Sequence, residues 1–143
     1  MECISYKDGY KYQLFEEYQT EIPVKPDGDI SSSGGYVFLS KEGKVVIKKG
    51  YAWDGPSGPT IDTLNFMRGS LIHDALYQLM RENKLIKDIY RDQADRFLQQ
   101  MCKDDGMSSI RAWLVYQGVS KFGESAADPT NIKLVLKAPK SCR

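Results

Sequence analysis

A segment rich in glycine and proline, residues 51–60, separates two parts of the chain that have different hydrophobic patterns. It reads Tyr-Ala-Trp-Asp-Gly-Pro-Ser-Gly-Pro-Thr, a composition typical of a loop with several turns. Apolar residues alternate with polar ones before this segment and recur at helical spacing after it. The chain is therefore predicted to be an α+β protein, with a small N-terminal antiparallel sheet packed on a C-terminal three-helix unit.

The first fifty residues carry the strand signals. Tyr10, Tyr12 and Leu14 alternate with polar residues, and the register shifts near Phe15. Glycine after a short polar stretch favours a hairpin turn between two later apolar runs. The predicted elements are strands at residues 10–24, 36–40 and 45–49, a loop at 27–35 and a hairpin turn at 41–44.

The second half carries three helical patterns. The first is apolar over a wide arc, which predicts a central helix. Capping residues and glycines predict where the helices begin and end. The expected bounds are Leu64 and Arg81 for the first helix, Asp88 and Gly106 for the second, and Ser108 or Ser109 and Gly123 for the third.

A length of 143 residues predicts one domain, 1–143. Its last part, residues 131–136, is apolar enough to be a strand that returns to the sheet. The predicted division is a β-rich part at 1–50, a glycine/proline loop at 51–63, a helical part at 64–123 and a tail at 124–143.

Composition excludes several classes of protein. The net charge is +1 without a basic stripe, so no nucleic-acid partner is expected. No apolar run is long enough to cross a membrane, and the N-terminus lacks the features of a signal peptide. The three cysteines, Cys3, Cys102 and Cys142, are too few and too widely spaced for a disulfide framework or a zinc site.

The only histidine, His73, lies in the first predicted helix. Histidine is the side chain whose ordinary pKa suits proton transfer near neutral pH. Because the first two helices are joined by a short connection, they are expected to pack antiparallel, and Asp95 then lies at the height of His73. Its carboxylate could hold one ring nitrogen of His73 and leave the other as a base. The plain alternative is that Asp95 pairs with Arg91 one turn away.

Asp74 follows His73 and points about 100° around the helix from it, toward the glycine loop. Carbonyl oxygens of that loop and one carboxylate would form an oxygen-only site, which suits calcium. The alternatives for Asp74 are a backbone cap or a pair with Arg68 or Lys84. Asp54 is either a further ligand or the first residue of an Asx turn.

Three motifs together resemble the phospholipase A-two signature. They are the loop from Tyr51 to Gly58, the sequence His73-Asp74-x-x-Tyr77 and the later Ala94-Asp95. The resemblance extends over about residues 50–106 and is greatest to the compact lipase domain of parvovirus capsid proteins. The whole chain also resembles a family of short phage and prophage proteins of unassigned function.

The lipase resemblance implies a role for each site residue. His73 would activate water, Asp95 would orient His73, and Tyr77 would join their hydrogen-bond network. Calcium would be held by Asp74 with Trp53, Gly55, Gly58 and Asp54, and the substrate would be a phospholipid. The phage resemblance implies a protein made in the host cytoplasm and carried by a virion, with a host factor as a further partner.

Two other interpretations stay open at this stage. The same helix pair could belong to a non-catalytic phage protein that is structural or that binds a small ligand or a host factor. Tyr77 would then be a core residue, and Trp53 would fill the space between sheet and helices. A different hydrolase is less consistent with the sequence, because the chain has one histidine and Cys102 lies two turns from Asp95.

Overall fold

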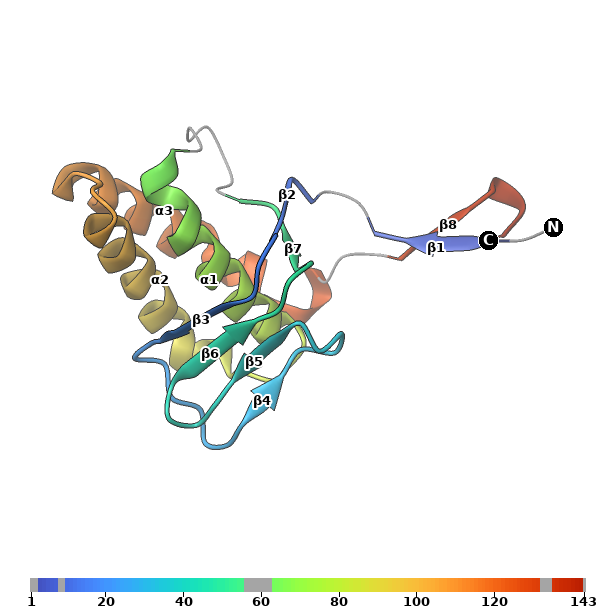
Figure 1. Cartoon of the computed structure of the whole chain (residues 1–143), viewed down its shortest axis with the longest axis horizontal. Coiled ribbons are helices and arrows are strands. Elements are labelled where there is room, and N and C mark those ends of the chain that lie inside the picture. Colours follow the sequence, from blue (N-terminus) through green and yellow to red (C-terminus); the bar gives the residue numbers. More distant parts are fainter. Residues whose placement is uncertain (1–2, 8–9, 56–62, 132–134, 143) are drawn as a thin grey trace.

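A computed structural model describes residues 3–7, 10–55, 63–131 and 135–142 of the chain. N-terminal antiparallel strands lie against three C-terminal helices (Figure 1), which confirms the predicted α+β class. The strands are β1 (Ile4–Tyr6), β2 (Tyr12–Gln13), β3 (Tyr18–Glu21), β4 (Ile30–Ser31), β5 (Val37–Leu39), β6 (Lys44–Ile47), β7 (Ala52–Trp53) and β8 (Leu136–Ala138). The helices are α1 (Leu64–Arg81), α2 (Lys87–Asp104) and α3 (Ser109–Ala127), followed by the 3-10 turns η1 (Pro129–Asn131) and η2 (Lys140–Cys142).

The main sheet has four strands in the order β3-β6-β5-β4, all antiparallel. The predicted hairpin is confirmed, since β5 and β6 pair Leu39 with Val45 and Val37 with Ile47. These four side chains have no exposed surface and belong to one buried cluster with α1. Alternation along each strand thus places one face of the sheet on the helices.

The predicted first strand is divided in two, because the chain changes partner at the register shift near Phe15. Its first piece, β2, pairs with β7 apart from the main sheet, while β3 pairs with β6. Three strands were missed: β1 precedes the first predicted strand, β4 lies in the predicted loop at 27–35, and β7 lies at the start of the predicted loop at 51–63. Each has only two or three residues, too few for alternation to indicate a strand.

The first helix has the predicted bounds. The second begins at Lys87 with Ile86 as its N-cap, so the prediction of Asp88 as the cap was wrong. Ser108 caps the third helix as predicted, because its hydroxyl accepts a hydrogen bond from the Arg111 amide. Gly123 does not end α3, which continues to Ala127.

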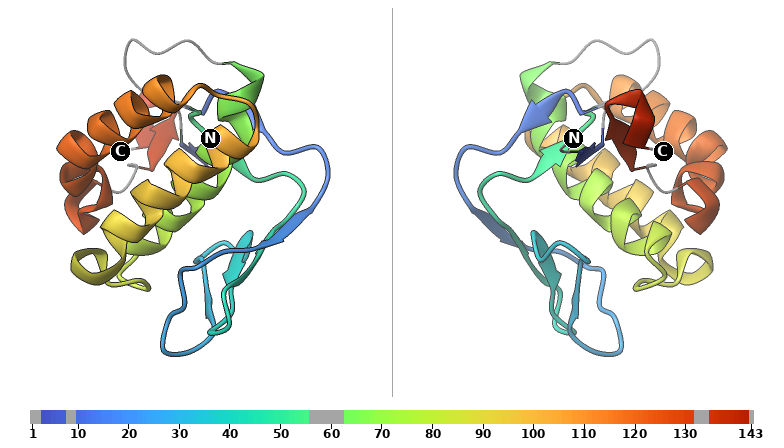
Figure 2. Two further views of the ribbon diagram at one scale, coloured as in Figure 1. Left: turned by 90° about the vertical axis from the view of Figure 1, so that its left-hand side faces the viewer. Right: turned by 90° about the vertical axis from the view of Figure 1, so that its right-hand side faces the viewer.

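Helices α1 and α2 pack antiparallel, as contacts along their length show. Arg68 near the start of α1 binds Asp105 at the end of α2, and His73 meets Asp95 nearer the middle. Figure 2 shows α3 alongside this pair. None of the helices among the described residues is long and apolar enough to span a membrane.

Both ends of the chain form a two-stranded ribbon, β1 with β8, that extends away from the rest of the molecule (Figure 1). Strand β8 covers residues 136–138 and pairs with β1, so it does not return to the main sheet as predicted. Residues 132–134 of the predicted strand at 131–136 lie outside the described residues. Cys3 and Cys142 are joined by a disulfide, which corrects the expectation from cysteine spacing. A single bridge between chain ends leaves no repeated spacing for a sequence pattern to reveal.

The hairpin between β5 and β6 depends on Gly43, which has a positive φ of 92°. An added Cβ would collide with the carbonyl oxygen of Ile22. We expect Gly43→Ala to lower the free energy of unfolding by about 1–3 kcal/mol. Urea unfolding measures this, and Gly28→Ala is the matched control, since a Cβ there meets nothing and should change stability by about 0.5 kcal/mol or less. Equal effects of the two variants would contradict the assigned turn.

Candidate functional site

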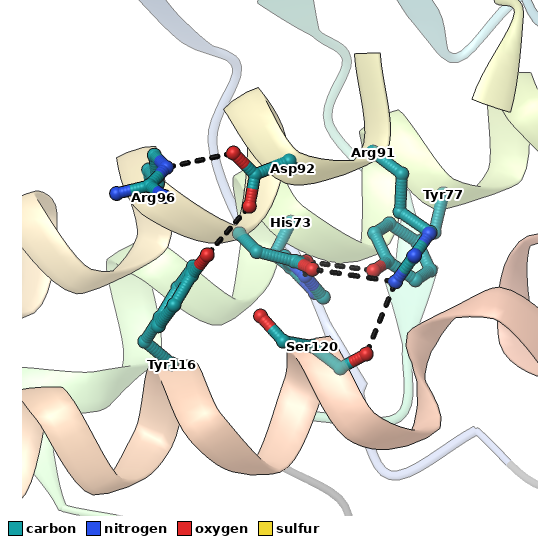
Figure 3. A network of polar contacts seen from close by, with 8 residues as sticks. His73, Tyr77, Arg91, Asp92, Arg96, Tyr116 and Ser120 are labelled. Carbon is teal, nitrogen blue, oxygen red and sulfur yellow. Dashed lines mark hydrogen bonds and ion pairs between the residues drawn. The ribbon is translucent and has the colours of Figure 1, made fainter. Parts of the chain in front are cut away.

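His73 and Asp95 form a direct contact between α1 and α2. The Nε2 atom of His73 lies 2.7 Å from Oδ1 of Asp95, as the sequence spacing predicts. Asp95 has no exposed surface, and His73 is 8% exposed. Figure 3 shows the network of polar contacts around this pair.

The partner of Nε2 determines which ring nitrogen is available for chemistry. An ionised carboxylate can only accept hydrogen bonds, so Nε2 carries the hydrogen that Asp95 accepts. In the neutral ring, Nδ1 then has the lone pair. No hydrogen bond joins Nδ1 to another residue of the described segments. The geometry is therefore that of a base oriented by a buried carboxylate.

Tyr77 completes the contact from the next turn of α1. Its hydroxyl donates to the same Oδ1 of Asp95 at 2.6 Å, and its ring lies 4.2 Å from the His73 ring, centre to centre. Burial and the hydrogen bond to Asp95 raise the pKa of Tyr77 well above its ordinary value, so the hydroxyl stays protonated. The prediction that Tyr77 belongs to this network is confirmed.

The third helix contacts Tyr77 through Gly123. A Cβ added at Gly123 would collide with the Tyr77 hydroxyl, so only glycine lets the ring reach Asp95 from this side. This explains why a glycine that was predicted to end the helix lies in its interior instead.

Arg91 occupies the other side of the Asp95 carboxylate. Its guanidinium Nη1 lies 3.9 Å from Oδ2 of Asp95 and donates to the carbonyl oxygen of Ser120 on α3 at 3.1 Å. The ion pair that was the plain alternative for Asp95 therefore exists alongside the histidine contact. One carboxylate therefore has both partners. Figure 3 shows Arg91 directed toward Ser120 on the third helix.

A small polar cavity of about 40 Å³ lies next to Asp74, on the side of α1 toward β7. Its wall combines acidic, basic and aromatic side chains from both halves of the chain. The lining residues are Lys7, Tyr10, Tyr51, Ala52, Trp53, Asp54, Asp74, Gln78, Arg81 and Glu82.

Two carboxylates, Asp54 and Asp74, meet in this cavity. Burial is the main cause that raises the pKa of Asp74, to about 6, and the nearby charge of Asp54 acts in the same direction. The charges of His73 and Arg81 and a hydrogen bond from the Asp54 backbone amide act in the opposite direction. Asp74 thus holds its proton more tightly than an ordinary aspartate. A bound cation would lower the pKa again, because a nearby positive charge favours the ionised carboxylate.

The other residues of the predicted calcium set are placed as follows. The Trp53 indole is buried and donates to the Ser70 hydroxyl at 3.1 Å, so it does fill the space between sheet and helices. Its carbonyl oxygen accepts the Lys11 amide and is thereby engaged in strand pairing. Gly55 has a φ of 74° and lies under the Tyr12 ring. Gly58 lies outside the described residues.

No group of three or more metal-binding side chains occurs among the residues that the structure describes. A cation at Asp74 would accordingly need backbone oxygens or water besides the two carboxylates. The ion pairs suggested for Asp74 do not form, because Arg68 binds Asp105 and Lys84 lies near Glu82.

Several residues around the site were missed from sequence. Gln78, Arg81 and Glu82 follow Asp74 by four, seven and eight positions, so helical spacing alone could have placed them on its face. Tyr51, whose hydroxyl donates to Gln78 at 3.0 Å, gave no comparable signal. Neither did Ser120, which contributes a backbone oxygen.

Residues 34–119 match the family model described as Protein of unknown function (DUF1353). The chain belongs to this family. The DUF1353 segment is more than half of the chain and includes β5, β6, β7, α1, α2 and the first part of α3. No curated protein and no solved structure matches the chain.

The raised pKa of Asp74 predicts how stability depends on pH. Between the ordinary value of 3.8 and about 6, the folded protein keeps the proton that the unfolded chain has released. Asp74 therefore lowers the free energy of unfolding as pH rises through this window, by up to about 3 kcal/mol. Asp74→Asn removes the effect. The free energy of unfolding of this variant, relative to that of the natural chain, should therefore increase between about pH 4 and about pH 7, a range that spans the window.

Urea unfolding across this pH range measures the difference. Asp27→Asn is the control, since it removes one negative charge from an exposed loop position. A flat difference for Asp74→Asn would contradict the raised pKa.

Gly123 provides a test of the packing behind Tyr77. We expect Gly123→Ala to lower the free energy of unfolding by about 1–3 kcal/mol, because the new methyl group displaces the Tyr77 hydroxyl from Asp95. In a Tyr77→Phe background the same change should cost less, and a double-mutant cycle measures the coupling. Gly118→Ala on the same helix meets nothing and should stabilise by up to about 1 kcal/mol. Additivity of the Tyr77 and Gly123 changes would contradict this contact.

Proposed function

We propose that this protein is a calcium-dependent hydrolase of the phospholipase A-two type, with His73 as its general base. One observation carries the proposal: a histidine whose Nε2 is held 2.7 Å from a fully buried carboxylate, leaving Nδ1 as the available base. The resemblance of the loop and helix motifs to the lipase signature points to the same chemistry.

In the proposed reaction, Nδ1 of His73 accepts a proton from a water molecule as the water attacks an ester carbonyl. Asp95 fixes the tautomer of the ring and stabilises the imidazolium that forms. Tyr77 and Arg91 keep the Asp95 carboxylate in place from opposite sides. The imidazolium then returns its proton to the leaving alcohol, so that no net proton is gained by the protein.

Asp74 is the proposed calcium ligand, with Asp54 and loop oxygens around it. The fit rests on the donors, since two neighbouring carboxylates and backbone oxygens are the kind of group that binds calcium. Bound calcium would polarise the ester carbonyl and stabilise its oxyanion. The adjacent positions of His73 and Asp74 on one helix turn would bring the base and the cation to one substrate.

The outer surface of α3 supports a lipid as the substrate. Ile110, Trp113 and Leu114 are large apolar side chains at helical spacing, and each has more than half of its surface exposed. Tryptophan beside aliphatic residues is common where proteins meet a lipid surface. We further propose the phage or prophage origin that the sequence resembles, with synthesis in the host cytoplasm and delivery in the virion.

A second candidate function is non-catalytic. His73 is only 8% exposed, and Asp95, Tyr77 and Arg91 form a network that also joins the three helices. A phage structural protein, or a protein that binds a small ligand or a host factor, could keep this network for stability alone. Turnover distinguishes the two candidates.

Hydrolysis of fluorescent phosphatidylcholine vesicles, with calcium, magnesium or chelator, tests the proposal. We expect turnover only with calcium, and His73→Gln should slow it by about 10²- to 10⁴-fold, the usual contribution of a general base. The fold of the variant is checked by its melting temperature. Turnover that persists in His73→Gln would contradict the assigned base.

The calcium site has its own readout. Calcium should raise the melting temperature of the natural chain and of Asp27→Asn, and Asp74→Asn should abolish this rise. Because protons compete for Asp74 below pH of about 6, calcium affinity should fall by about tenfold per pH unit there. An Asp74-dependent rise without turnover would favour the non-catalytic candidate, while no rise at all would remove calcium from the proposal.

A further inference from the structure

A second cavity, larger than the one next to Asp74, lies between α1 and the chain that joins β2 to β3. It is an open groove of about 440 Å³, within the range of sites that hold small molecules. Figure 2 shows the joining chain curving away from α1. Trp53 lines both this groove and the Asp54–Asp74 cavity, so the two sites are neighbours.

Three aromatic side chains line the groove, namely Phe15, Tyr18 and Trp53. Two of them are held in place, because the Tyr18 hydroxyl accepts a hydrogen bond from Arg68 and the Trp53 indole donates one to Ser70. Phe15 is 79% exposed, which leaves its ring open to a ligand. Grouped aromatic side chains are a common way to bind quaternary ammonium ions, because the face of each ring attracts a cation.

The charges at the groove also favour a cation. Glu16 and Glu17 line it, and neither forms a salt bridge with a basic side chain in the described part of the chain. Arg68 lines the groove as well, but its guanidinium binds both carboxylate oxygens of Asp105, at 2.6 and 3.0 Å. Because that pair is close to neutral, the two glutamates determine the charge that a ligand meets.

The protein itself shows that the Phe15 ring can bind a cation. The ammonium of Lys49 lies 5.6 Å from the centre of this ring, the distance of a cation–π contact. A cationic ligand at the same ring would be repelled by Lys49. Removal of the Lys49 charge should therefore improve the binding of such a ligand, which a purely apolar groove would not predict.

The rest of the groove is aliphatic, lined by Leu14, Met67 and Leu71. An alkyl chain covers a surface of this kind, because contact removes apolar area from water on both sides. A methylated lysine would use the aromatic side chains and the glutamates but would leave the aliphatic part uncovered. The lining therefore favours a ligand that has a cationic head group and an apolar chain.

We propose that this groove binds a single-chain amphiphile whose head group is a quaternary ammonium ion. The head group lies among the three aromatic side chains and the two glutamates, and the alkyl chain lies on the aliphatic wall. This inference goes beyond the proposed function, because binding requires neither calcium nor hydrolysis. The shared Trp53 would place the bound amphiphile beside the Asp54–Asp74 cavity.

NMR of the methionine methyl groups locates the ligand. Met67 lines the groove, whereas Met80, Met101 and Met107 are buried and line neither cavity. Dodecyltrimethylammonium, below its micelle concentration, is added to the full chain with ¹³C-labelled methionine, and Met67→Leu assigns the reporting signal. We expect this signal to shift saturably while the three buried methionines keep theirs. Dodecyl maltoside, a neutral amphiphile with the same chain, should bind at least about fivefold more weakly.

Variants of the lining separate charge from apolar contact. Glu16→Gln with Glu17→Gln should weaken binding of the cationic probe by about fivefold to tenfold, and Lys49→Gln should strengthen it by about twofold. Both changes should leave the affinity for dodecyl maltoside unaltered. Phe15→Leu should weaken binding of the cation by about twofold to fivefold, the contribution of an exposed cation–π contact. Glu42→Gln, at an exposed position in the β5–β6 turn, is the matched control and should change neither affinity.

Three results would overturn the proposal. Equal affinities for the cationic and the neutral probe would show an apolar groove without a cation site. No shift of the Met67 signal, or equal shifts of the buried methionines, would show that the groove does not hold the amphiphile. Equal affinity for N-acetyl-trimethyllysine amide, which lacks the long chain, would favour a methylated peptide instead. None of these results bears on hydrolysis, which the vesicle assay measures separately.

Discussion

A carboxylate that has no contact with water must be neutralised by the groups around it, and Asp95 is the centre of such an arrangement. Its two oxygens collect His73 and Tyr77 from α1 and Arg91 from its own helix. Arg91 reaches on to α3 through the Ser120 carbonyl. Leaving a buried charge without its partners costs several kcal/mol, on the order of 3–5. The packing of all three helices is therefore coupled to one side chain, and the position of the His73 ring follows from it.

Asp74 on α1 and Asp95 on α2 are two carboxylates near His73 that have different surroundings. Asp95 meets hydrogen-bond donors and a guanidinium, while Asp74 is placed where burial and a second carboxylate favour its proton. His73 lies between them, with one ring nitrogen fixed by Asp95. Since Asp74 follows His73 at about 100° around the helix, the two residues point to different surroundings yet remain close. Helix α1 is therefore the centre of the candidate site, because it carries both the histidine that contacts Asp95 and the carboxylate that lines the cavity.

Long, periodic elements and contacts between them could be predicted from the sequence. The bounds of α1 and the meeting of His73 with Asp95 follow from helical rise and a short connection. Gly123 could not be interpreted correctly, because its role depends on Tyr77, which is 46 positions away in the sequence, and not on its neighbours. The disulfide and the position of β8 could not be predicted for a similar reason, because pairing between the two chain ends leaves no local pattern in the sequence. The prediction was least accurate in the loops, as β7 inside the glycine segment illustrates.

The extent of the family match separates what the DUF1353 segment contributes from what its surroundings add. The match at residues 34–119 includes Asp54, His73, Asp74, Tyr77 and Asp95. The His73–Asp95 pair and both carboxylates of the cavity therefore lie within it. Ser120, which binds Arg91, and Gly123, which contacts Tyr77, lie just beyond the end of the match. Lys7 and Tyr10 lie before its start. The α1–α2 contact and β7 therefore belong to the family segment, whereas the terminal ribbon and its disulfide lie outside it.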